Sequence, residues 1–208
     1  MNDSTIISID NLNISLKSQS AVLLPLLASF SLTINEGEYK TLSSPTGTGK
    51  TTLLNYIAGI LECNNEETQK RFEISGSFEK IQDLQIAYAF QEPRLIQGIS
   101  VLKNVMLPLE NQMTKQEAKA LSLMWLQKLN LFNKEQLQPS LLSGGEQQRA
   151  GLARAFAYSQ VSKLPCLLLL DEPFASQDQK NAENIKNLIL EQIKRPGHAA
   201  LIVSHSRA

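Results

Sequence analysis

The sequence predicts an α/β fold with a mostly parallel sheet at its centre, an antiparallel β subdomain at the N-terminus and an inserted α-helical subdomain. Two continuous apolar runs, Ile86–Phe90 and Leu167–Leu170, are typical of strands that are covered on both faces. Helical patterns alternate with these runs, which favours parallel strands joined by helices. The length of 208 residues is enough for one sizeable hydrophobic core.

The first part of the chain predicts strands followed by one helix. Thr5–Leu16 alternates apolar and polar residues and Phe30–Ile34 repeats the pattern, so we expect an antiparallel sheet to open the fold. Tyr39–Leu42 predicts a short strand, and Thr51–Ile60 predicts a helix. The polar segment Leu61–Arg71 is expected to be a loop. The inner face of the helix is expected to carry Leu53, Leu54, Ile57 and Ala58.

The middle of the chain, from about Pro93 to Leu142, is expected to be a mostly helical insertion. Thr114 and Glu117 have the spacing of a capping box, which predicts the start of a helix. The apolar residues after this box recur at helical spacing and predict one buried side. These residues are Ala118, Leu121, Trp125 and Leu129.

The last part of the chain predicts two helices and two strands. Ser143 and Glu146 repeat the capping-box spacing and predict a helix through about Ala157. After the strand at residues 167–170, a further helix is expected to end at Pro196-Gly197, and Ala199–Val203 predicts a last strand. The helical spacing of that further helix is carried by Ala182, Ile185, Leu188, Ile189 and Ile193.

Composition excludes some classes of function. Lys+Arg and Asp+Glu both number 20, so the chain lacks the basic excess of a nucleic-acid surface, and we expect no nucleic-acid partner. Cys63 and Cys166 show no pairing pattern, and Cys166 is expected to be a buried free thiol in a reducing compartment. The N-terminus lacks the basic region of a secretory signal. The apolar runs are shorter than the roughly 20 residues that span a bilayer, so another chain would have to supply any span.

A glycine-rich segment at residues 44–52 follows the predicted strand Tyr39–Leu42 and opens the predicted helix. It matches the later half of the P-loop pattern, in which backbone N–H groups surround phosphate oxygens. Lys50 is expected to reach the β and γ phosphates, and the Thr51 hydroxyl to bind Mg²⁺. The alternative is a turn without a ligand. The expected nucleotide-binding residues are Ser44, Pro45, Thr46, Gly47, Thr48, Gly49, Lys50, Thr51 and Thr52.

A pair of carboxylates, Asp171 and Glu172, ends the leucine run. This places both at the carboxyl edge of a parallel sheet, where ligands of open α/β folds bind. Asp171 is expected to hold Mg²⁺, through a water molecule, and Glu172 to act as general base toward the attacking water. The alternative is a strand that ends in two solvated acids, and the upstream P-loop pattern favours the catalytic interpretation.

Gln91 and His205 follow predicted strands at the same edge. The amide oxygen of Gln91 is placed to contact the metal and the attacking water, and to link the helical insertion to the nucleotide. His205 is placed to donate a hydrogen bond to the γ-phosphate. The alternatives are a surface glutamine and a structural or solvated histidine.

Together these residues resemble the ATP-binding cassette (ABC) ATPases over nearly the whole chain. The most specific element is the resemblance to the family's signature motif at Leu142-Ser143-Gly144-Gly145-Glu146-Gln147-Gln148-Arg149. Its helix start forms an anion site, which in the family meets the γ-phosphate bound by the other subunit. The resemblance implies an ATPase that binds ATP and Mg²⁺ at the interface of a head-to-tail dimer, with a second copy or a paralogous ABC ATPase as partner.

The same resemblance assigns further segments. Gln91 matches the family's Q-loop, 174–178 its D-loop with Asp178, and His205 its switch histidine. It also implies that residues 1–208 form one P-loop NTPase domain. In that division about 1–92 and 150–208 form a RecA-like core with the β subdomain, and about 93–149 form the helical subdomain with the signature motif.

The segment Phe90–Leu95, followed by Val101–Val105, resembles importer ATPases of the nitrate/sulfonate/taurine type. This resemblance implies an integral membrane permease that docks at the Q-loop, and a substrate-binding protein as a further partner. It also implies a cytoplasmic location on the inner face of the cell membrane. Val105–Leu109 resembles ATPases of the lipoprotein-release and macrolide-export group as well, so that alternative stays open.

The sequence departs from the family pattern at several places. Ser44 replaces the first P-loop glycine, and Gln177 stands where the family usually has leucine. Lys17–Leu24 offers no aromatic residue to stack on adenine, so weaker ATP binding is expected. The chain stops at Ala208, just past the residue that matches the switch histidine, so no regulatory domain is expected, and the family's usual last helices are expected to be missing or cut off. These departures keep open a cassette with slow turnover and a regulatory role.

Overall fold

A computed structural model of the chain describes residues 4–17, 23–43, 45, 47–61, 66–161 and 164–204. Its central sheet has the strand order β3-β7-β6-β5, and all neighbouring strands in it are parallel. The predicted α/β class with a parallel core is therefore confirmed. The strands of this sheet are β3 (Tyr39–Ser43), β5 (Gln85–Ala89), β6 (Cys166–Asp171) and β7 (His198–Ser204).

A second sheet is antiparallel, as the opening of the sequence predicts, with β1 (Thr5–Lys17) between β2 (Leu23–Asn35) and β4 (Phe72–Lys80). β2 begins earlier than Phe30, and β4 was not predicted. The alternation of apolar residues in β4 breaks at Gly76, which has a positive φ of 104°. A Cβ atom at Gly76 would lie 2.5 Å from the carbonyl oxygen of Asn11, so the close approach of β1 requires glycine here. Because glycine has no apolar side chain, it interrupts the alternation by which β4 could have been recognised in the sequence.

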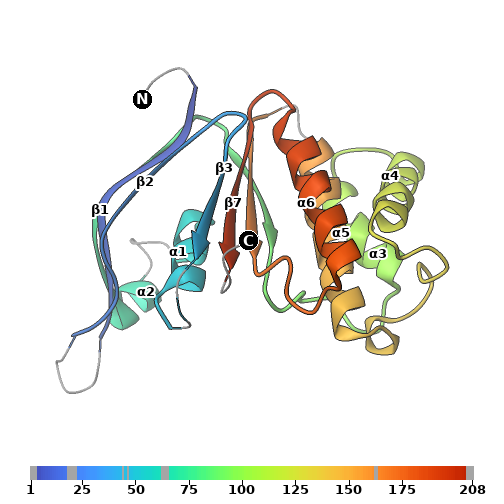
Figure 1. The fold of residues 1–208 in the computed structure, drawn as a ribbon, viewed down its shortest axis with the longest axis horizontal. Coiled ribbons are helices and arrows are strands. Elements are labelled where there is room, and N and C mark those ends of the chain that lie inside the picture. Colours follow the sequence, from blue (N-terminus) through green and yellow to red (C-terminus); the bar gives the residue numbers. More distant parts are fainter. Residues whose placement is uncertain are drawn as a thin grey trace.

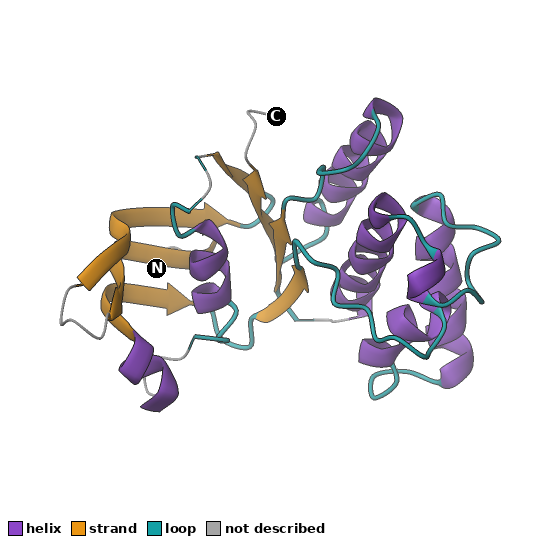
Figure 2. Cartoon of the chain, turned by 90° about the horizontal axis from the view of Figure 1, so that it is seen from below, coloured by secondary structure: helices purple, strands orange, loops and turns teal. Residues whose placement is uncertain are grey.

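The two faces of β6 bury different cores, because side chains alternate along a strand. Leu168 and Leu170 belong to the core beneath the helices, whereas Leu167 and Leu169 belong to the core shared with the antiparallel sheet. Helix α1 (Lys50–Ile57) lies between the two sheets, and the remaining large helices cover the opposite face of the parallel sheet (Figures 1 and 2). The parallel sheet is thus covered on both faces, as its apolar runs predict.

The helices begin where the capping residues predict. In α4 (Lys115–Lys128), the Thr114 hydroxyl accepts from the Glu117 N–H and the Glu117 carboxylate accepts from the Thr114 N–H. Two helices differ in length from the prediction. Helix α1 ends at Ile57 rather than Ile60, and the helix that follows Ser143 continues to Val161 rather than ending near Ala157. The other elements on this side are α3 (Val101–Met106), η1 (Leu107–Leu109), η2 (Pro139–Leu141), α5 (Gly144–Val161) and α6 (Gln179–Ile193).

A short helix, α2 (Glu66–Arg71), stands where a loop was expected. Its first turn carries Glu66 and Glu67, and its last turn carries Lys70 and Arg71. Acidic residues near the N-terminus and basic residues near the C-terminus complement the helix dipole. The prediction of a loop was wrong. It rested on the polarity of the segment, whereas the order of the charged residues along the segment favours a helix.

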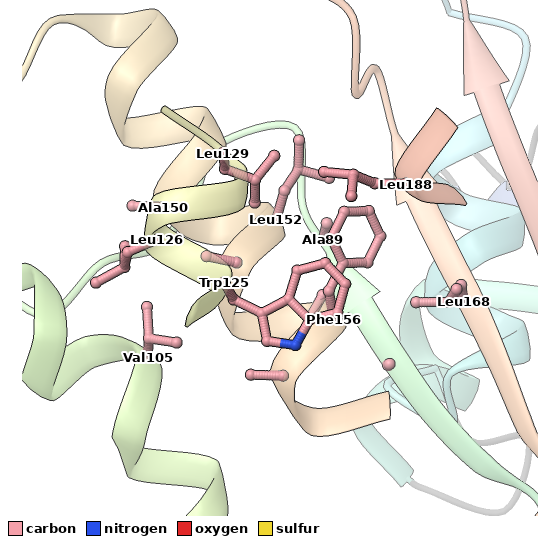
Figure 3. Close-up of a cluster of buried hydrophobic side chains, with 14 of the residues drawn as sticks. Ala89, Val105, Trp125, Leu126, Leu129, Ala150, Leu152, Phe156, Leu168 and Leu188 are labelled. Carbon is pink, nitrogen blue, oxygen red and sulfur yellow. The ribbon is translucent and has the colours of Figure 1, made fainter. Parts of the chain in front are cut away.

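The helical core is centred on Trp125 of α4 and Phe156 of α5, whose ring centroids lie 5.2 Å apart (Figure 3). Both side chains are fully buried, and the indole N–H of Trp125 donates to Gln160 Oε1 at 2.9 Å. The same cluster contains Ala89 of β5 and Leu168 of β6. These contacts attach α4 and α5 to the parallel sheet.

Cys166 is a free and fully buried thiol, as expected, and burial raises its pKa to about 12. Cys63 lies outside the described residues. Within the described part of the chain, none of the helices combines the length and the apolar character needed to cross a bilayer.

Replacing Phe156 by alanine tests the importance of the helical core. Because Phe156 is fully buried against Trp125, we expect Phe156→Ala to lower the free energy of unfolding by about 3–5 kcal/mol in urea denaturation. Phe132 is 61% exposed and provides the matched control, for which a change within about 0.5 kcal/mol is expected. Equal losses in the two variants would contradict the assignment of Phe156 to the core.

Candidate functional site

The glycine-rich loop connects the end of β3 at Ser43 to the start of α1 at Lys50. Gly47 and Gly49 have φ angles of 82° and 77°, a left-handed conformation that favours glycine. A Cβ atom at Gly49 would also lie 2.4 Å from the carbonyl oxygen of Leu26 in β2. Two expected nucleotide-binding residues, Ser44 and Thr46, lie outside the described residues, so the effect of serine at the first glycine position stays a prediction.

Lys50, the first residue of α1, is only 8% exposed and turns back over the loop. Its Nζ donates to the carbonyl oxygen of Pro45 at 2.8 Å and lies 3.5 Å from Thr48 Oγ1. These acceptors are neutral oxygens, and a charged phosphate oxygen is a stronger acceptor for an ammonium group. The loop therefore presents a cation and a helix N-terminus at one place, which suits a polyphosphate.

Thr51 and Asp171 meet at the carboxyl edge of the sheet although they are far apart in sequence. The Thr51 hydroxyl donates to Asp171 Oδ2 at 2.9 Å, and Asp171 is 3% exposed at the end of β6. A hydroxyl and a carboxylate are oxygen ligands of the kind that Mg²⁺ prefers, either directly or through water. The residues present thus fit the magnesium ion that the sequence predicts.

A cavity of about 240 Å³ joins these groups. It is lined by P-loop residues together with Leu26, Gln91, Asp171 and Glu172. Tyr88 lies close by in β5, and its hydroxyl donates to Asn55 Oδ1 at 3.3 Å. Burial first, and the charge of Asp171 second, raise the pKa of Tyr88, so this phenol stays neutral at physiological pH.

Glu172 lies next to Asp171 at the same edge and is 6% exposed. Its φ of 52° is unusual for a residue other than glycine, and such strained conformations are found preferentially at functional sites. The N–H of Glu172 donates to the Val203 carbonyl at 2.9 Å, and its carbonyl accepts from Gln148 Nε2 in α5. The backbone at Glu172 is therefore held by both β7 and the start of α5.

Gln91 is exposed just beyond β5 and lines two cavities of the site. The chain after it is fixed by Arg154 of α5, whose guanidinium donates to the carbonyls of Pro93 at 2.6 Å and Arg94 at 3.0 Å. The guanidinium of Arg94 in turn lies 4.2 Å from the centre of the Phe90 ring. Arg154 was missed by sequence reasoning, because an arginine within a helix carries no local signal of the distant loop that it contacts.

The start of α5 carries the expected signature residues. The N–H of Ser143 donates to Glu146 Oε2 at 2.9 Å, and the N–H of Glu146 donates to Ser143 Oγ at 3.4 Å, as the capping box predicts. Gln147 Nε2 donates to the carbonyl of Leu142, which is buried. Ser143 and Gly144 are exposed, so the helix N-terminus faces outward. Such an end attracts anions.

Lys134 also contacts this helix start, and sequence reasoning did not identify it. Its Nζ forms a salt bridge with Glu146 Oε1. The hydrogen bond from Lys134, followed by the N–H of Ser143, lowers the pKa of Glu146. The Glu146 carboxylate therefore stays charged while it holds the capping box.

A second cavity, of about 520 Å³, brings the start of α5 together with the edge of the sheet. Its lining includes Thr51, Gln91 and Asp171 on one side and Gly144 and Gln147 on the other. Residues that are distant in sequence thus surround one cleft. His205 lies outside the described residues, so its place at this cleft stays a prediction.

Asp178, the expected D-loop residue, caps α6. Its carboxylate accepts from the Asn181 N–H at 2.7 Å, and this hydrogen bond is the main cause of a lowered pKa. Asp178 is exposed, so this cap lies at the surface of the protein. Sequence reasoning placed this residue but not the cap that it forms.

Known proteins match the chain over most of its length. A family model described as ABC transporter matches residues 27–175. The sulfate/thiosulfate import ATP-binding protein CysA 2 of Rhizobium meliloti is 35% identical over 188 residues, which cover 88% of this chain and 50% of that protein. The aliphatic sulfonates import ATP-binding protein SsuB 1 of Nocardia farcinica is 37% identical over 174 residues, or 84% of this chain and 63% of that protein.

A further relative is covered more completely. The uncharacterized ABC transporter ATP-binding protein YvrO of Bacillus subtilis is 31% identical over 188 residues, which cover 87% of this chain and 79% of that protein. By contrast, the chain spans about half to two thirds of the length of the two import proteins.

Solved structures agree with the sequence comparisons. A bacterial ABC transporter cassette in dimeric form has a TM-score of 0.81 and 26% identity, and the match covers 97% of this chain and 88% of that one. A post-hydrolysis state of that cassette, bound to ADP and Pi, has a TM-score of 0.79. Because the family match covers well over half of the chain, the chain belongs to the ABC transporter family as an ATP-binding cassette.

Proposed function

We propose that this chain is the ATP-binding and ATP-hydrolysing subunit of an ABC transporter. The observation that carries the proposal is the contact between Thr51 and Asp171, because it joins the P-loop helix to the acidic end of β6. Glu172 follows directly and lines the same cavity as Lys50. These are the groups that phosphoryl transfer to water requires: a phosphate-binding cation, oxygen ligands for Mg²⁺ and a carboxylate for the attacking water.

Each side chain has a proposed role. Lys50 and the N–H groups of residues 47–52 would bind the phosphates, and Thr51, Asp171 and the amide oxygen of Gln91 would hold Mg²⁺. The ion would neutralise charge on the phosphates. Glu172 orients the attacking water and accepts its proton. His205 is proposed to contact the γ-phosphate.

The active unit is proposed to be a head-to-tail dimer with a second copy or a paralogous ABC ATPase. The exposed start of α5, with Ser143 and Gly144, supplies the anion site for the partner's ATP. The dimeric form of the similar cassette supports this arrangement. Each chain is proposed to be a single domain. In it, residues of about 93–149 form the helical subdomain, and the remaining residues form the core with the β subdomain.

The dimer is proposed to drive an integral membrane permease, with a substrate-binding protein, in an importer. Similarity to import proteins for sulfate and sulfonates supports this direction of transport. The permease is proposed to dock beside the segment 91–95, whose backbone Arg154 fixes. The chain would then lie in the cytoplasm on the inner face of the membrane, attached through the permease.

The first test uses the variant Glu172→Gln and makes two measurements: its rate of ATP hydrolysis, and its mass in solution with and without ATP. Loss of the carboxylate removes the proton acceptor, so turnover is expected to fall by about 10²–10⁴-fold while ATP binding is kept. ATP should then convert the variant from monomer to dimer. Glu183→Gln, at an exposed position of α6, is the control and should keep the unmodified rate. Persistent monomer at saturating ATP would contradict the shared-interface proposal.

A second test concerns the metal. Asp171→Asn keeps the size of the side chain but removes its charge, so Mg²⁺-dependent binding of ATP is expected to weaken by about 10–100-fold. Binding measured with EDTA should change little. The control is Asp10→Asn, an exposed residue of β1, which should bind as the unmodified chain does in both conditions. An equal loss with and without Mg²⁺ would show that Asp171 does not act through the ion.

A further inference from the structure

Gln177 occupies an unusual position between the sheet edge and α5. It follows Glu172 by five residues in the segment 174–178, and it is half-buried. Its side-chain oxygen accepts from Arg149 Nη1 at 2.8 Å. Its side-chain nitrogen lies 2.8 Å from Gln148 Oε1, 3.1 Å from the Gly145 carbonyl and 3.3 Å from the Ala175 carbonyl. One amide therefore joins three residues in the first turns of α5.

The partners fix the orientation of this amide. Arg149 can only donate, so the oxygen of Gln177 must face it, and the Gly145 carbonyl can only accept, so the nitrogen must face it. This assignment also fixes the orientation of the Gln148 amide. Gln148 uses its oxygen to accept from Gln177, which leaves its nitrogen to donate to the carbonyl of Glu172. Hydrogen bonds thus run in one direction from Arg149 through both glutamines to the backbone of Glu172.

Backbone packing brings the two segments into close contact. A Cβ atom at Gly145 would lie 2.6 Å from the Ser176 carbonyl oxygen and 3.4 Å from Gln177 Nε2. Arg149 is 9% exposed and Gln148 is 7% exposed, so most of this network is shielded from water. Buried polar groups that lose a partner are costly, and linked hydrogen bonds behave as a unit.

We propose that Gln177 is a positioning residue that couples the start of α5 to the backbone of Glu172 through Gln148. A shift of the α5 start then moves the catalytic carboxylate, and the reverse also holds. A leucine at position 177 could fill the space but could supply none of these hydrogen bonds. The consequence for turnover rests on the proposed ATPase function, whereas the coupling of the two segments does not.

The test compares Gln177→Leu with Gln179→Leu, an exposed control at the start of α6. Since Gln177 does not line the P-loop cavity, kcat for ATP hydrolysis is expected to fall about three- to tenfold while KM for ATP stays within about twofold. Gln177→Glu keeps the acceptor for Arg149 but lacks the donor for Gln148, and should lose kcat similarly. The control should match the unmodified chain.

A double-substitution cycle identifies the route. Gln148→Leu should lower kcat as Gln177→Leu does, and the variant with both changes should be no slower than the slower single variant, because both act through one chain of hydrogen bonds. Independent, multiplying losses would overturn the proposed route through Gln148. A rise in KM alone would overturn the positioning role.

Amide hydrogen exchange of the ATP-free protein separates this inference from the proposed function. Gln177→Leu should speed exchange in both residues 174–178 and 145–149, and Gln179→Leu in neither. Faster exchange in the first segment alone, or in neither, would overturn the coupling. If the unmodified chain hydrolyses no ATP, the proposed function fails, and the exchange result still decides whether Gln177 couples the two segments.

Discussion

Burial of β6 on both faces is the constraint on which the rest of the structure depends. Leu168 and Leu170 pack beneath the helices, while Leu167 and Leu169 pack toward α1 and the antiparallel sheet. A strand held from both sides has a fixed register, since a slip of one residue would exchange its two faces. That register determines where the strand ends, and it ends at Asp171. The position of the acidic pair is therefore a product of core packing, not of the loop that follows.

Much of the fold could be predicted because local signals agree with tertiary packing. Both capping boxes, at Thr114 and Ser143, start helices where the spacing indicates. The local signals fail where a residue type is required by contact with a segment that is distant in the sequence. Gly76 interrupts the alternation of β4 because β1 passes too close for a side chain. In α2, a polar segment becomes helical through the order of its charges, which composition does not reveal.

The candidate site also contains residues that could be predicted from the sequence and residues that could not. The proximity of Lys50, Thr51 and Asp171 could be predicted, because the glycine-rich loop and the acidic strand end are each recognisable from a few consecutive residues. Residues that hold these segments in place could not, since their partners lie far along the chain. Lys134 reaches Glu146, Arg154 reaches Pro93, and Gln177 reaches Arg149. Gln177 could be noticed only as a departure from a pattern, and the folded arrangement was needed to give it a role.

The contact between Gly49 and Leu26 has a genetic consequence. Because the Leu26 carbonyl oxygen of β2 lies 2.4 Å from where a Cβ at Gly49 would stand, the antiparallel sheet packs directly against the glycine-rich loop. Backbone changes in β2, such as a residue gained or lost near Pro25, would then alter the shape of the loop without touching any residue in it. A search for second-site suppressors of defects in the glycine-rich loop should therefore recover changes in β2, which the linear motif alone would not suggest.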